Sequence, residues 1–200
     1  MLYYERKFRS KGFDCIIGVD EAGRGPLAGP VVAAAVALDP GRFKNRIDDS
    51  KKLTAPEREK AFLEIVRKST FGIGIVSEKV IDRINILAAT RVAMEQAIAS
   101  LLKKLGRGKK RRTHIIVDGN MNLNAALAHT CIIKGDAKSK SIAAASILAK
   151  VTRDRIMEAY DRVFPQYGFK QHKGYPTQIH RERLKKFGPS IIHRESFLNG

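Results

Sequence analysis

The chain has 200 residues, of which 44% are hydrophobic, and a formal net charge of +18 at pH 7. This length and apolar content suit one globular domain with a substantial core and at most a small appendage. The positive charge is far from that of a typical metabolic enzyme and favours a polyanionic partner, most often nucleic acid. A solvated lysine-rich surface is the alternative that composition leaves open.

The sequence pattern predicts neither a membrane protein nor a secreted one. No apolar segment approaches the ~18 residues of a membrane-spanning helix, and no signal peptide follows Met1. Cys15 and Cys131 are each flanked by apolar residues, which predicts buried thiols in a reducing compartment and no disulfide framework. We therefore expect a soluble, cytoplasmic protein that makes no contact with a membrane.

The first predicted elements are two strands and a helix. Residues 16–20 and 30–38 are apolar runs that predict two strands joined by a glycine-rich loop. Thr54 and Glu57 form the pattern of a capping box, which predicts the start of a helix that ends near Ser69. The apolar face of this helix would consist of Phe62, Leu63, Ile65 and Val66.

The remaining elements alternate between strands and helices. They are a strand at 71–76 weakened by Gly72 and Gly74, a long amphipathic helix over 84–105, strands at 114–118 and 130–133, a helix over 141–160 and, in a basic tail from Pro165, a helix capped by Thr177. This order predicts an α/β fold. Its mixed five-stranded sheet, flanked by helices, would begin as an antiparallel meander and continue through parallel crossovers.

Acidic side chains lie at the points where two of the apolar strands end. Asp20 ends the first strand and Glu21 follows it, and Asp118 ends the strand at 114–118. Adjacent carboxylates are costly unless a cation lies between them, and a divalent metal is the obvious candidate. Ligand sites gather at the carboxyl ends of parallel strands, so these acids would meet at one edge if the two strands are neighbours.

Asp136 and Asp154 are the two candidates for a fourth acid. Asp136 lies between the fifth strand and the long helix, at the same edge of the sheet as the other acids. Asp154 follows along that helix at a distance of about 27 Å, so both cannot belong to one site. We choose Asp136 and interpret Asp154 as a helix-surface acid between Arg153 and Arg155.

Four carboxylates in so basic a protein predict bound cations, and an oxygen-only ligand set favours Mg²⁺ or Mn²⁺ over zinc. A two-metal nuclease site fits, with one ion activating water and the other stabilising the leaving oxygen. No serine, histidine or cysteine nucleophile is then required. The loop around Gly23-Arg24-Gly25 formally matches a dinucleotide-binding pattern, but a strand follows it where that pattern requires a helix.

Several segments spread in order along nearly the whole chain form a set of motifs. They are DEAGRGPLAGPV at 20–31, DSKKL at 49–53, VDGN at 117–120, GDAK at 135–138, AASILAKVTRD at 144–154, GYPT at 174–177 and HRESF at 193–197. Together they resemble the motifs of bacterial ribonuclease HII. The resemblance implies a ribonuclease H-like catalytic domain at 1–164, with a C-terminal helical extension at 165–200 packed on the same domain.

The resemblance implies a metal-dependent endoribonuclease. It would cleave the RNA strand of RNA–DNA hybrids and incise 5′ of a single ribonucleotide embedded in duplex DNA, leaving 3′-hydroxyl and 5′-phosphate ends. Asp20, Glu21, Asp118 and Asp136 would be the catalytic, metal-binding acids, with two Mg²⁺ or Mn²⁺ ions in the active complex. We expect the protein to act as a monomer.

The resemblance also assigns residues to the nucleic acid. Gly23, Arg24 and Gly25 would contact the 2′-hydroxyl and phosphate of the ribonucleotide, because the 2′-hydroxyl is what distinguishes RNA from DNA. Tyr175 would pack against the sugar of the following deoxynucleotide and so sense the junction. Charge alone suggests further phosphate contacts, for which a solvated surface role is equally open: Lys51, Lys138 and Lys140.

Two rival functions and one basic segment complete the predictions. A non-catalytic nucleic-acid-binding protein would gain nothing from four carboxylates facing its polyanion. A nuclease of the same fold that acts on DNA alone would not need a reader of the 2′-hydroxyl. The basic residues 109–112 enter the strand at 114–118 at the end opposite the acids, so we place them outside the site, where they are available to flanking duplex.

Overall fold

The computed structural model describes residues 1–106, 112–124 and 127–198. Its centre is a mixed five-stranded sheet with the strand order β3-β2-β1-β4-β5. The strands are β1 (Cys15–Ala22), β2 (Val31–Leu38), β3 (Ser69–Val76), β4 (Thr113–Asp118) and β5 (His129–Ile132). β1, β2 and β3 form an antiparallel meander, and β4 pairs in parallel with β1 and β5. The predicted topology is confirmed, and the strands that carry Asp20 and Asp118 are neighbours.

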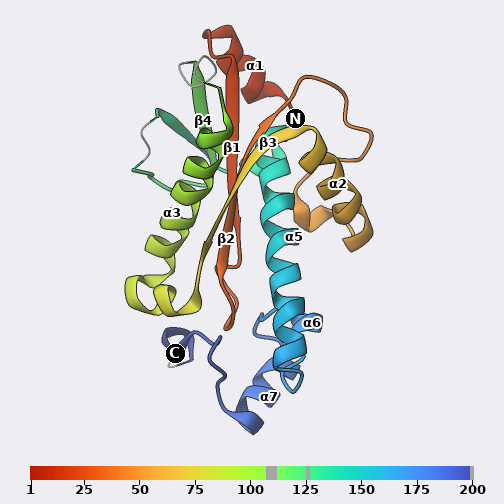
Figure 1. Ribbon diagram of the computed structural model, residues 1–200, viewed down its shortest axis with the longest axis vertical. Coiled ribbons are helices and arrows are strands. Elements are labelled where there is room, and N and C mark those ends of the chain that lie inside the picture. Colours follow the sequence, from red (N-terminus) through yellow and green to blue (C-terminus); the bar gives the residue numbers. More distant parts are fainter. Residues whose placement is uncertain (107–111, 125–126, 199–200) are drawn as a thin grey trace.

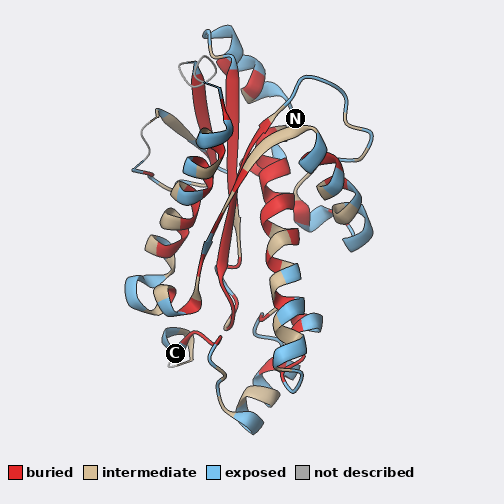
Figure 2. Ribbon diagram, viewed as in Figure 1, coloured by how far each residue is buried: buried red, intermediate tan, exposed pale blue. Residues whose placement is uncertain are grey.

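Helices cover both faces of the sheet (Figure 1). α3 packs on one face, and α5 and α2 pack on the other. Figure 2 shows the buried residues on the strands and on the helix faces turned toward them, whereas α7 is mostly exposed. The helices are α1 (Tyr3–Ser10), α2 (Ala55–Arg67), α3 (Glu78–Lys104), α5 (Lys140–Val163), α6 (Phe169–His172) and α7 (Gln178–Phe187).

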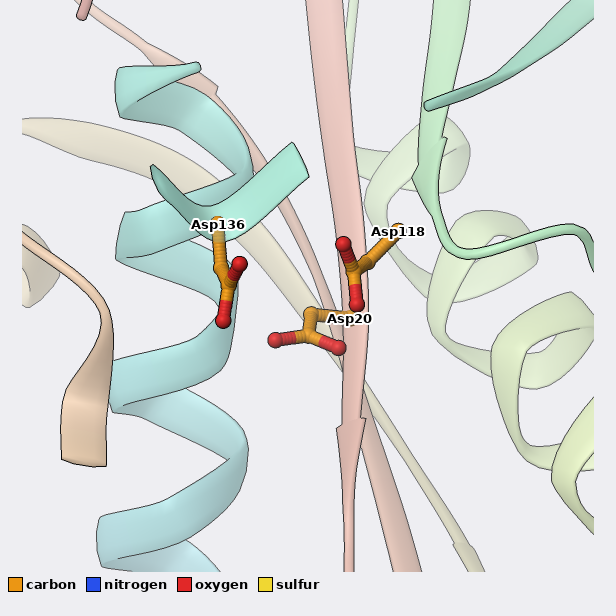
Figure 3. A group of neighbouring side chains, drawn as sticks. All are labelled: Asp20, Asp118 and Asp136. Carbon is orange, nitrogen blue, oxygen red and sulfur yellow. The ribbon is translucent and has the colours of Figure 1, made fainter. Parts of the chain in front are cut away.

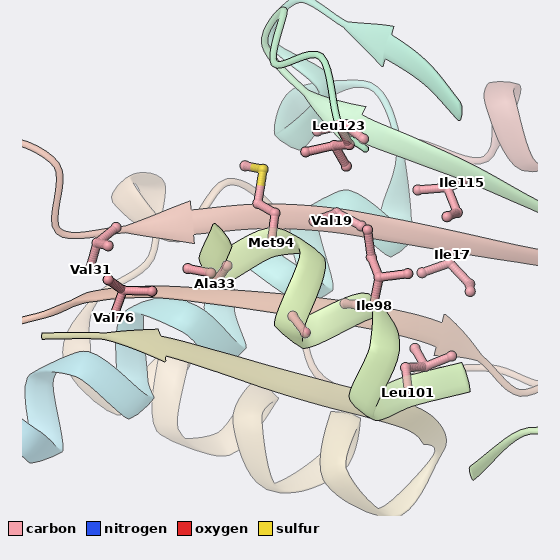
Figure 4. Close-up of a cluster of buried hydrophobic side chains, with 14 of the residues drawn as sticks. Ile17, Val19, Val31, Ala33, Val76, Met94, Ile98, Leu101, Ile115 and Leu123 are labelled. Atoms are coloured by element: carbon pink, nitrogen blue, oxygen red, sulfur yellow. The ribbon is translucent and has the colours of Figure 1, made fainter. Parts of the chain in front are cut away.

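The larger part of the core lies between the sheet and α3. Ile17 and Val19 of β1 face Met94, Ile98 and Leu101 of α3 (Figure 4). Each of these side chains is at least 97% buried, which stabilises the fold by about 1.5–3 kcal/mol per side chain. This packing holds β1 rigidly in the middle of the sheet, and β1 is the strand that carries the first acids.

Glycines allow both helical layers to lie close to the sheet. A Cβ atom at Gly74 of β3 would lie 1.9 Å from the carbonyl oxygen of Ala93 in α3, and Gly72 is equally crowded. A Cβ atom at Gly18 of β1 would lie 2.2 Å from the carbonyl carbon of Ser141 in α5. The glycines of β3, which the sequence suggested as a weakness, are therefore required by the contact with α3.

The capping box predicted for α2 is present, with Thr54 and Glu57 bonded to each other's backbone N–H groups. α3 begins at Glu78, earlier than the predicted residue 84. Asn85 interrupts it with a positive φ of 63°, and its Oδ1 accepts the N–H groups of Leu87 and Ala88. The amphipathic pattern therefore identified only the part of α3 that follows this second cap.

One helix was missed and two predictions about burial are wrong. No element was predicted for the residues of α1. Leu63 and Val66 of α2 are 45% and 36% exposed, because Ile65 is the residue of that face that reaches the core. Cys131 is exposed, while Cys15 is buried as predicted. β5 is an edge strand whose Ile132 is turned inward, so the preceding residue, Cys131, points away from the core.

The residues after Phe164 lie beyond the hairpin that joins β1 and β2 (Figure 1). They are anchored to α5 and to this hairpin by an apolar cluster of Ala28, Met157, Tyr167, Phe169 and Ile192. α7 is capped by Thr177, as predicted. Within the described ranges, no helix combines the length and the apolar character needed to span a membrane.

Candidate active site

Three carboxylates converge at the end of the parallel part of the sheet (Figure 3). Asp20 lies on β1, Asp118 is the last residue of β4, and Asp136 lies in the 3-10 turn Gly135–Ala137 that precedes α5. One carboxylate oxygen from each lies within 4.8 Å of the others. This group contains three of the four predicted acids, and it contains Asp136 and not Asp154, as the helix geometry predicted.

The pairing of β1 with β4 explains why Asp20 and Asp118 meet. Their parallel ladder ends at the pair Val19 and Val117, so the next residue of each strand is an aspartate. Because side chains alternate along a strand, both aspartates point to the α5 face, and the two valines point to α3. The N–H of Gly135 donates to Asp118 Oδ1 at 2.6 Å, which ties the turn before α5 to the end of β4.

The carboxylates are held in an environment that disfavours their charge. Burial raises the pKa of Asp20 well above its usual range, and the nearby Glu21 and Asp118 raise it further. Burial also raises the pKa of Asp136, with Asp118 and Asp49 adding to the effect. The site therefore carries more negative charge than the protein groups around it compensate.

The donor set fits a divalent cation. Every ligand atom that converges is a carboxylate oxygen, which is the donor that Mg²⁺ and Mn²⁺ prefer. The cationic group recorded beside the three acids is Lys51, whose Nζ lies 3.9 Å from Asp136 Oδ2 and whose side chain is 83% exposed. An ion pair with so exposed a lysine stabilises the negative charge of the site only weakly. One or more metal ions would supply the missing positive charge.

Glu21, the fourth predicted acid, has a different position. Glu21 is not among the three carboxylates whose oxygens converge, but after burial its charge is the largest cause of the raised pKa of Asp20, so it lies beside the group. Its Oε1 accepts Arg24 Nη1 at 3.3 Å. Burial raises the pKa of Glu21, while Arg24 lowers it and Asp118 raises it, so Glu21 remains within electrostatic reach of the site.

Three residues without an assigned role also support the acids. Ser146 of α5 hydrogen-bonds to Asp20 and shares a buried hydrogen bond of 2.9 Å with Ser50. Asp49 accepts the N–H of Lys51 and caps the turn that places Lys51 beside the site. Ser50 and Ser146 are 96 residues apart in the sequence, so no local pattern could predict their contact. The only sequence signal for a role was that each lies in one of the motifs, at 49–53 and at 144–154.

The two glycines of the Gly-Arg-Gly loop differ in their surroundings: Gly23 is buried and Gly25 is exposed. Gly23 has a φ of +99°, and a Cβ atom there would lie 2.1 Å from Nε of Arg153. The side chain of Arg24 is 47% exposed. Gly25 is exposed, and a Cβ atom there would have no atom within 4 Å. The fold therefore explains the glycine at Gly23 but not the glycine at Gly25.

Two fully buried arginines hydrogen-bond to the backbone of this loop and of the residues that follow it, up to Pro30. Arg153 of α5 donates to the carbonyl oxygens of Pro30, Ala28 and Lys173 at 2.9–3.0 Å. Arg194 donates to the carbonyl oxygens of Gly23, Arg24 and Gly29 at 2.6–3.0 Å. Burial, and after it the charge of Arg153, lower the pKa of Arg194 to about 9. Sequence reasoning gave these arginines no role; the available signal was their presence in the motifs at 144–154 and 193–197, but residue type alone does not distinguish a buried arginine from a solvated one.

Tyr175 lies on a turn that is linked to the same loop. The N–H of Leu27 donates to the carbonyl oxygen of Gly174 at 2.8 Å. The ring of Tyr175 is accompanied by Lys150 Nζ at 5.6 Å, and the residue is 39% exposed. Asp154 is half-buried and pairs with Lys150 at 2.7 Å, so it is less exposed than the predicted surface acid.

The other predicted cationic contacts are separate from the acids. Lys138 Nζ donates to the carbonyl oxygen of Ile133 at 2.8 Å and is exposed. Of the basic residues 109–112, only Arg112 lies within the described part of the chain, and it pairs with Asp14 at 3.2 Å. Residues 109–111 lie outside the described residues.

Comparisons with known proteins agree with this architecture. A family model described as ribonuclease HII matches residues 17–200. Ribonuclease HII of Ruminiclostridium cellulolyticum is 52% identical over 199 residues, which cover 99% of this chain and 75% of that protein. Ribonuclease HII of Pseudothermotoga lettingae is 50% identical over 196 residues, which cover 98% and 83%. The crystal structure of ribonuclease H2 from Pyrococcus horikoshii OT3 has a TM-score of 0.70 at 27% identity, covering 92% of this chain and 96% of that one.

The fold and the converging acids define a hydrolase of the ribonuclease H class, which is a metal-dependent class of nuclease acting on nucleic acid. The match over nearly the whole chain then decides the family. The chain belongs to the ribonuclease HII family and has ribonuclease H function.

Proposed function

We propose that this protein cleaves the RNA strand of RNA–DNA hybrids and incises 5′ of single ribonucleotides in duplex DNA. The observation that carries the proposal is the convergence of Asp20, Asp118 and Asp136 within 4.8 Å beside an accessible glycine-rich loop. The net charge of +18 provides the general attraction for a duplex. The products would have 3′-hydroxyl and 5′-phosphate ends.

The acids would hold two divalent ions, Mg²⁺ or Mn²⁺. Asp20, Asp118 and Asp136 would bind them directly, and Glu21 would join when it is released from Arg24. Bound ions would supply an activated water and would neutralise the charge that develops on the leaving oxygen. The protein's own contribution is to fix these carboxylates by the β1–β4 register and the Gly135 hydrogen bond, and to leave their charge uncompensated.

The Gly-Arg-Gly loop would recognise the ribose. Gly25 presents backbone without a side chain to solvent, so a sugar can approach it closely. Arg24 would contact the phosphate, which frees Glu21 for the ions. Gly23 would contribute through its backbone, which Arg194 holds in place.

The C-terminal extension, residues 165–200, would complete the substrate site on the catalytic domain formed by residues 1–164. Tyr175, whose ring is partly exposed, would pack against the sugar of the following deoxynucleotide. Lys51 and Lys138 would contact phosphates. The protein would act as a monomer.

A single assay tests the proposal. Duplex DNA with one ribonucleotide is incubated with Mg²⁺, with Mn²⁺ or with a chelator, and the cut strand is mapped. Asp20→Asn and Asp118→Asn should each abolish cleavage, whereas Asp39→Asn, at an exposed acid outside the converging group, should not. Cleavage in the chelator, cleavage of all-DNA duplex or full activity of both acid variants would contradict the proposal.

A further inference from the structure

Three buried histidines lie beneath the turn that carries Tyr175. His172, His180 and His193 are 8%, 0% and 3% exposed. The rings of His172 and His180 stack with centroids 4.3 Å apart, and Nε2 of His180 lies 3.1 Å from Nε2 of His193. The metal site does not use them, and no carboxylate is hydrogen-bonded to their rings among the described residues.

The protonation of His193 follows from its backbone partner. A backbone N–H can only donate, and the N–H of Ser190 lies 2.9 Å from His193 Nδ1. Nδ1 is therefore the acceptor of this ring. In the neutral imidazole the proton then lies on Nε2, which faces His180.

His180 has the complementary tautomer. Its Nδ1 lies 2.9 Å from the carbonyl oxygen of Tyr175, and a carbonyl oxygen can only accept. Nδ1 therefore carries the proton of His180, and Nε2 is left as the acceptor for His193. The chain of hydrogen bonds runs in one direction, from Ser190 through His193 and His180 to the backbone of Tyr175, with one proton on each ring.

His172 fixes the other side of the same turn. The N–H of Gly174 donates to His172 Nδ1 at 3.2 Å, and His172 Nε2 donates to the carbonyl oxygen of Tyr167 at 2.9 Å. The carbonyl oxygen of Gly174 accepts from Leu27, next to the Gly-Arg-Gly loop. The peptide groups before and after Tyr175 are thus held by histidines and by Leu27, while the residue remains 39% exposed.

We propose that His180 and His193, supported by His172, form a neutral hydrogen-bond relay that positions Tyr175 against the Gly-Arg-Gly loop and thereby sets the preference for a ribonucleotide–deoxynucleotide junction. This role rests on the proposed function of Tyr175. The relay aligns a backbone carbonyl and makes no hydrogen bond to the phenol ring, which suits a residue that must present a flat surface at a defined place. Burial lowers the pKa of both His180 and His193 to about 4, which keeps the rings neutral near pH 7.

The tautomers are tested first, by nitrogen-detected NMR of the imidazole rings in the intact protein at pH 7. We expect a protonated Nδ1 in His180 and a protonated Nε2 in His193. The opposite assignment, or a charged ring at either position, would overturn the relay. This measurement does not depend on activity, so it stands even if the proposed function fails.

The link to Tyr175 is tested by kinetics on two substrates, a duplex with one ribonucleotide and a continuous RNA–DNA hybrid. His180→Leu removes the donor to Tyr175 and should lower kcat/KM about tenfold on the single ribonucleotide while changing the hybrid much less. His180→Asn keeps an N–H donor near the position of Nδ1 and should restore most of the preference. In a Tyr175→Ala background, His180→Leu should not change further the ratio of kcat/KM on the single-ribonucleotide duplex to kcat/KM on the hybrid.

Controls separate positioning from folding. His114 is also buried, but it stacks on Phe8 and hydrogen-bonds to Thr130, so His114→Leu should lower the melting temperature without changing the substrate ratio. If His180→Leu does not fold, His193→Gln and His193→Leu repeat the comparison one step along the relay. Equal losses on both substrates, or full additivity with Tyr175→Ala, would overturn the proposal. A wild-type protein without metal-dependent cleavage would instead refute the proposed function.

Discussion

Replacing Gly25 with alanine is expected to impair cleavage while leaving the fold intact. Gly25 is exposed, its φ lies outside the left-handed region, and a Cβ atom there would have no atom within 4 Å. Nothing in the free protein therefore requires glycine at this position. The added methyl group should leave the free energy of unfolding unchanged or raise it by up to about 1 kcal/mol, by reducing the entropy of the unfolded chain. The melting temperature would rise by at most about 4 °C.

The effect on activity should be much larger. If the ribose approaches the backbone of Gly25, a methyl group there displaces the substrate by about 1 Å, and such a misplacement costs about 100-fold in rate. That loss corresponds to about 2.7 kcal/mol of transition-state stabilisation. Gly25→Val, with a larger side chain, should lose more activity than Gly25→Ala and still fold.

Two other glycines are the matched controls. Gly23→Ala should lower stability and activity together, because φ is +99° and the new Cβ would lie 2.1 Å from Arg153 Nε. Gly106→Ala, also without an atom within 4 Å but just beyond the end of α3, should change neither. Calorimetry and kcat/KM on a duplex with one ribonucleotide measure both quantities. Full activity of Gly25→Ala, or a loss of melting temperature as large as that of Gly23→Ala, would refute the reasoning.

Three further predictions follow from the charges in the structure. Asp20→Asn should raise the melting temperature of the metal-free protein, because it removes a carboxylate whose pKa burial and neighbouring acids raise; it should also reduce the stabilisation by Mg²⁺ that calorimetry detects in the wild type. Lowering the pH from 6.5 toward about 4 should reduce the free energy of unfolding, because burial lowers the pKa of His180 and His193 to about 4 and the unfolded chain is protonated first. Urea titrations should show a smaller decrease of the free energy of unfolding over this pH range in His180→Asn than in the wild type. Arg194→Lys should cost about 2–4 kcal/mol and lower cleavage, because a compact ammonium group cannot reproduce the planar fork of Nε, Nη1 and Nη2 that bonds the carbonyl oxygens of three residues; a variant as stable as the wild type would contradict this.

Features that depend on neighbouring residues could be predicted from the sequence. The strands followed from apolar runs, and the caps of α2 and α7 followed from Thr54 and Thr177, since each cap needs only residues within one turn. The choice of Asp136 over Asp154 needed only the rise of a helix.

Features that depend on distant contacts could not be predicted. The helix α1 has a charged sequence, and its place is fixed by Glu5, whose carboxylate accepts hydrogen bonds from Ser139 and Ser141 at the start of α5. The buried arginines are another example. Arg153 and Arg194 bond to carbonyl oxygens far away in the sequence, and no local pattern records such partners.

These arginines bear on how a site with so many acids binds a polyanion. Among the described residues, neither Arg153 nor Arg194 forms an ion pair with a carboxylate. Glu78 and Asp82 raise the pKa of Arg194, but by less than burial and Arg153 lower it, so the positive charge beneath the Gly-Arg-Gly loop is only partly compensated. The pKa of Arg194, lowered to about 9 by burial and by Arg153, reflects this excess. A phosphate above the loop would offset it, just as cations would offset the excess negative charge of the aspartates. The free protein thus holds two opposite charge imbalances, and a nucleic acid that binds together with metal ions would relieve both.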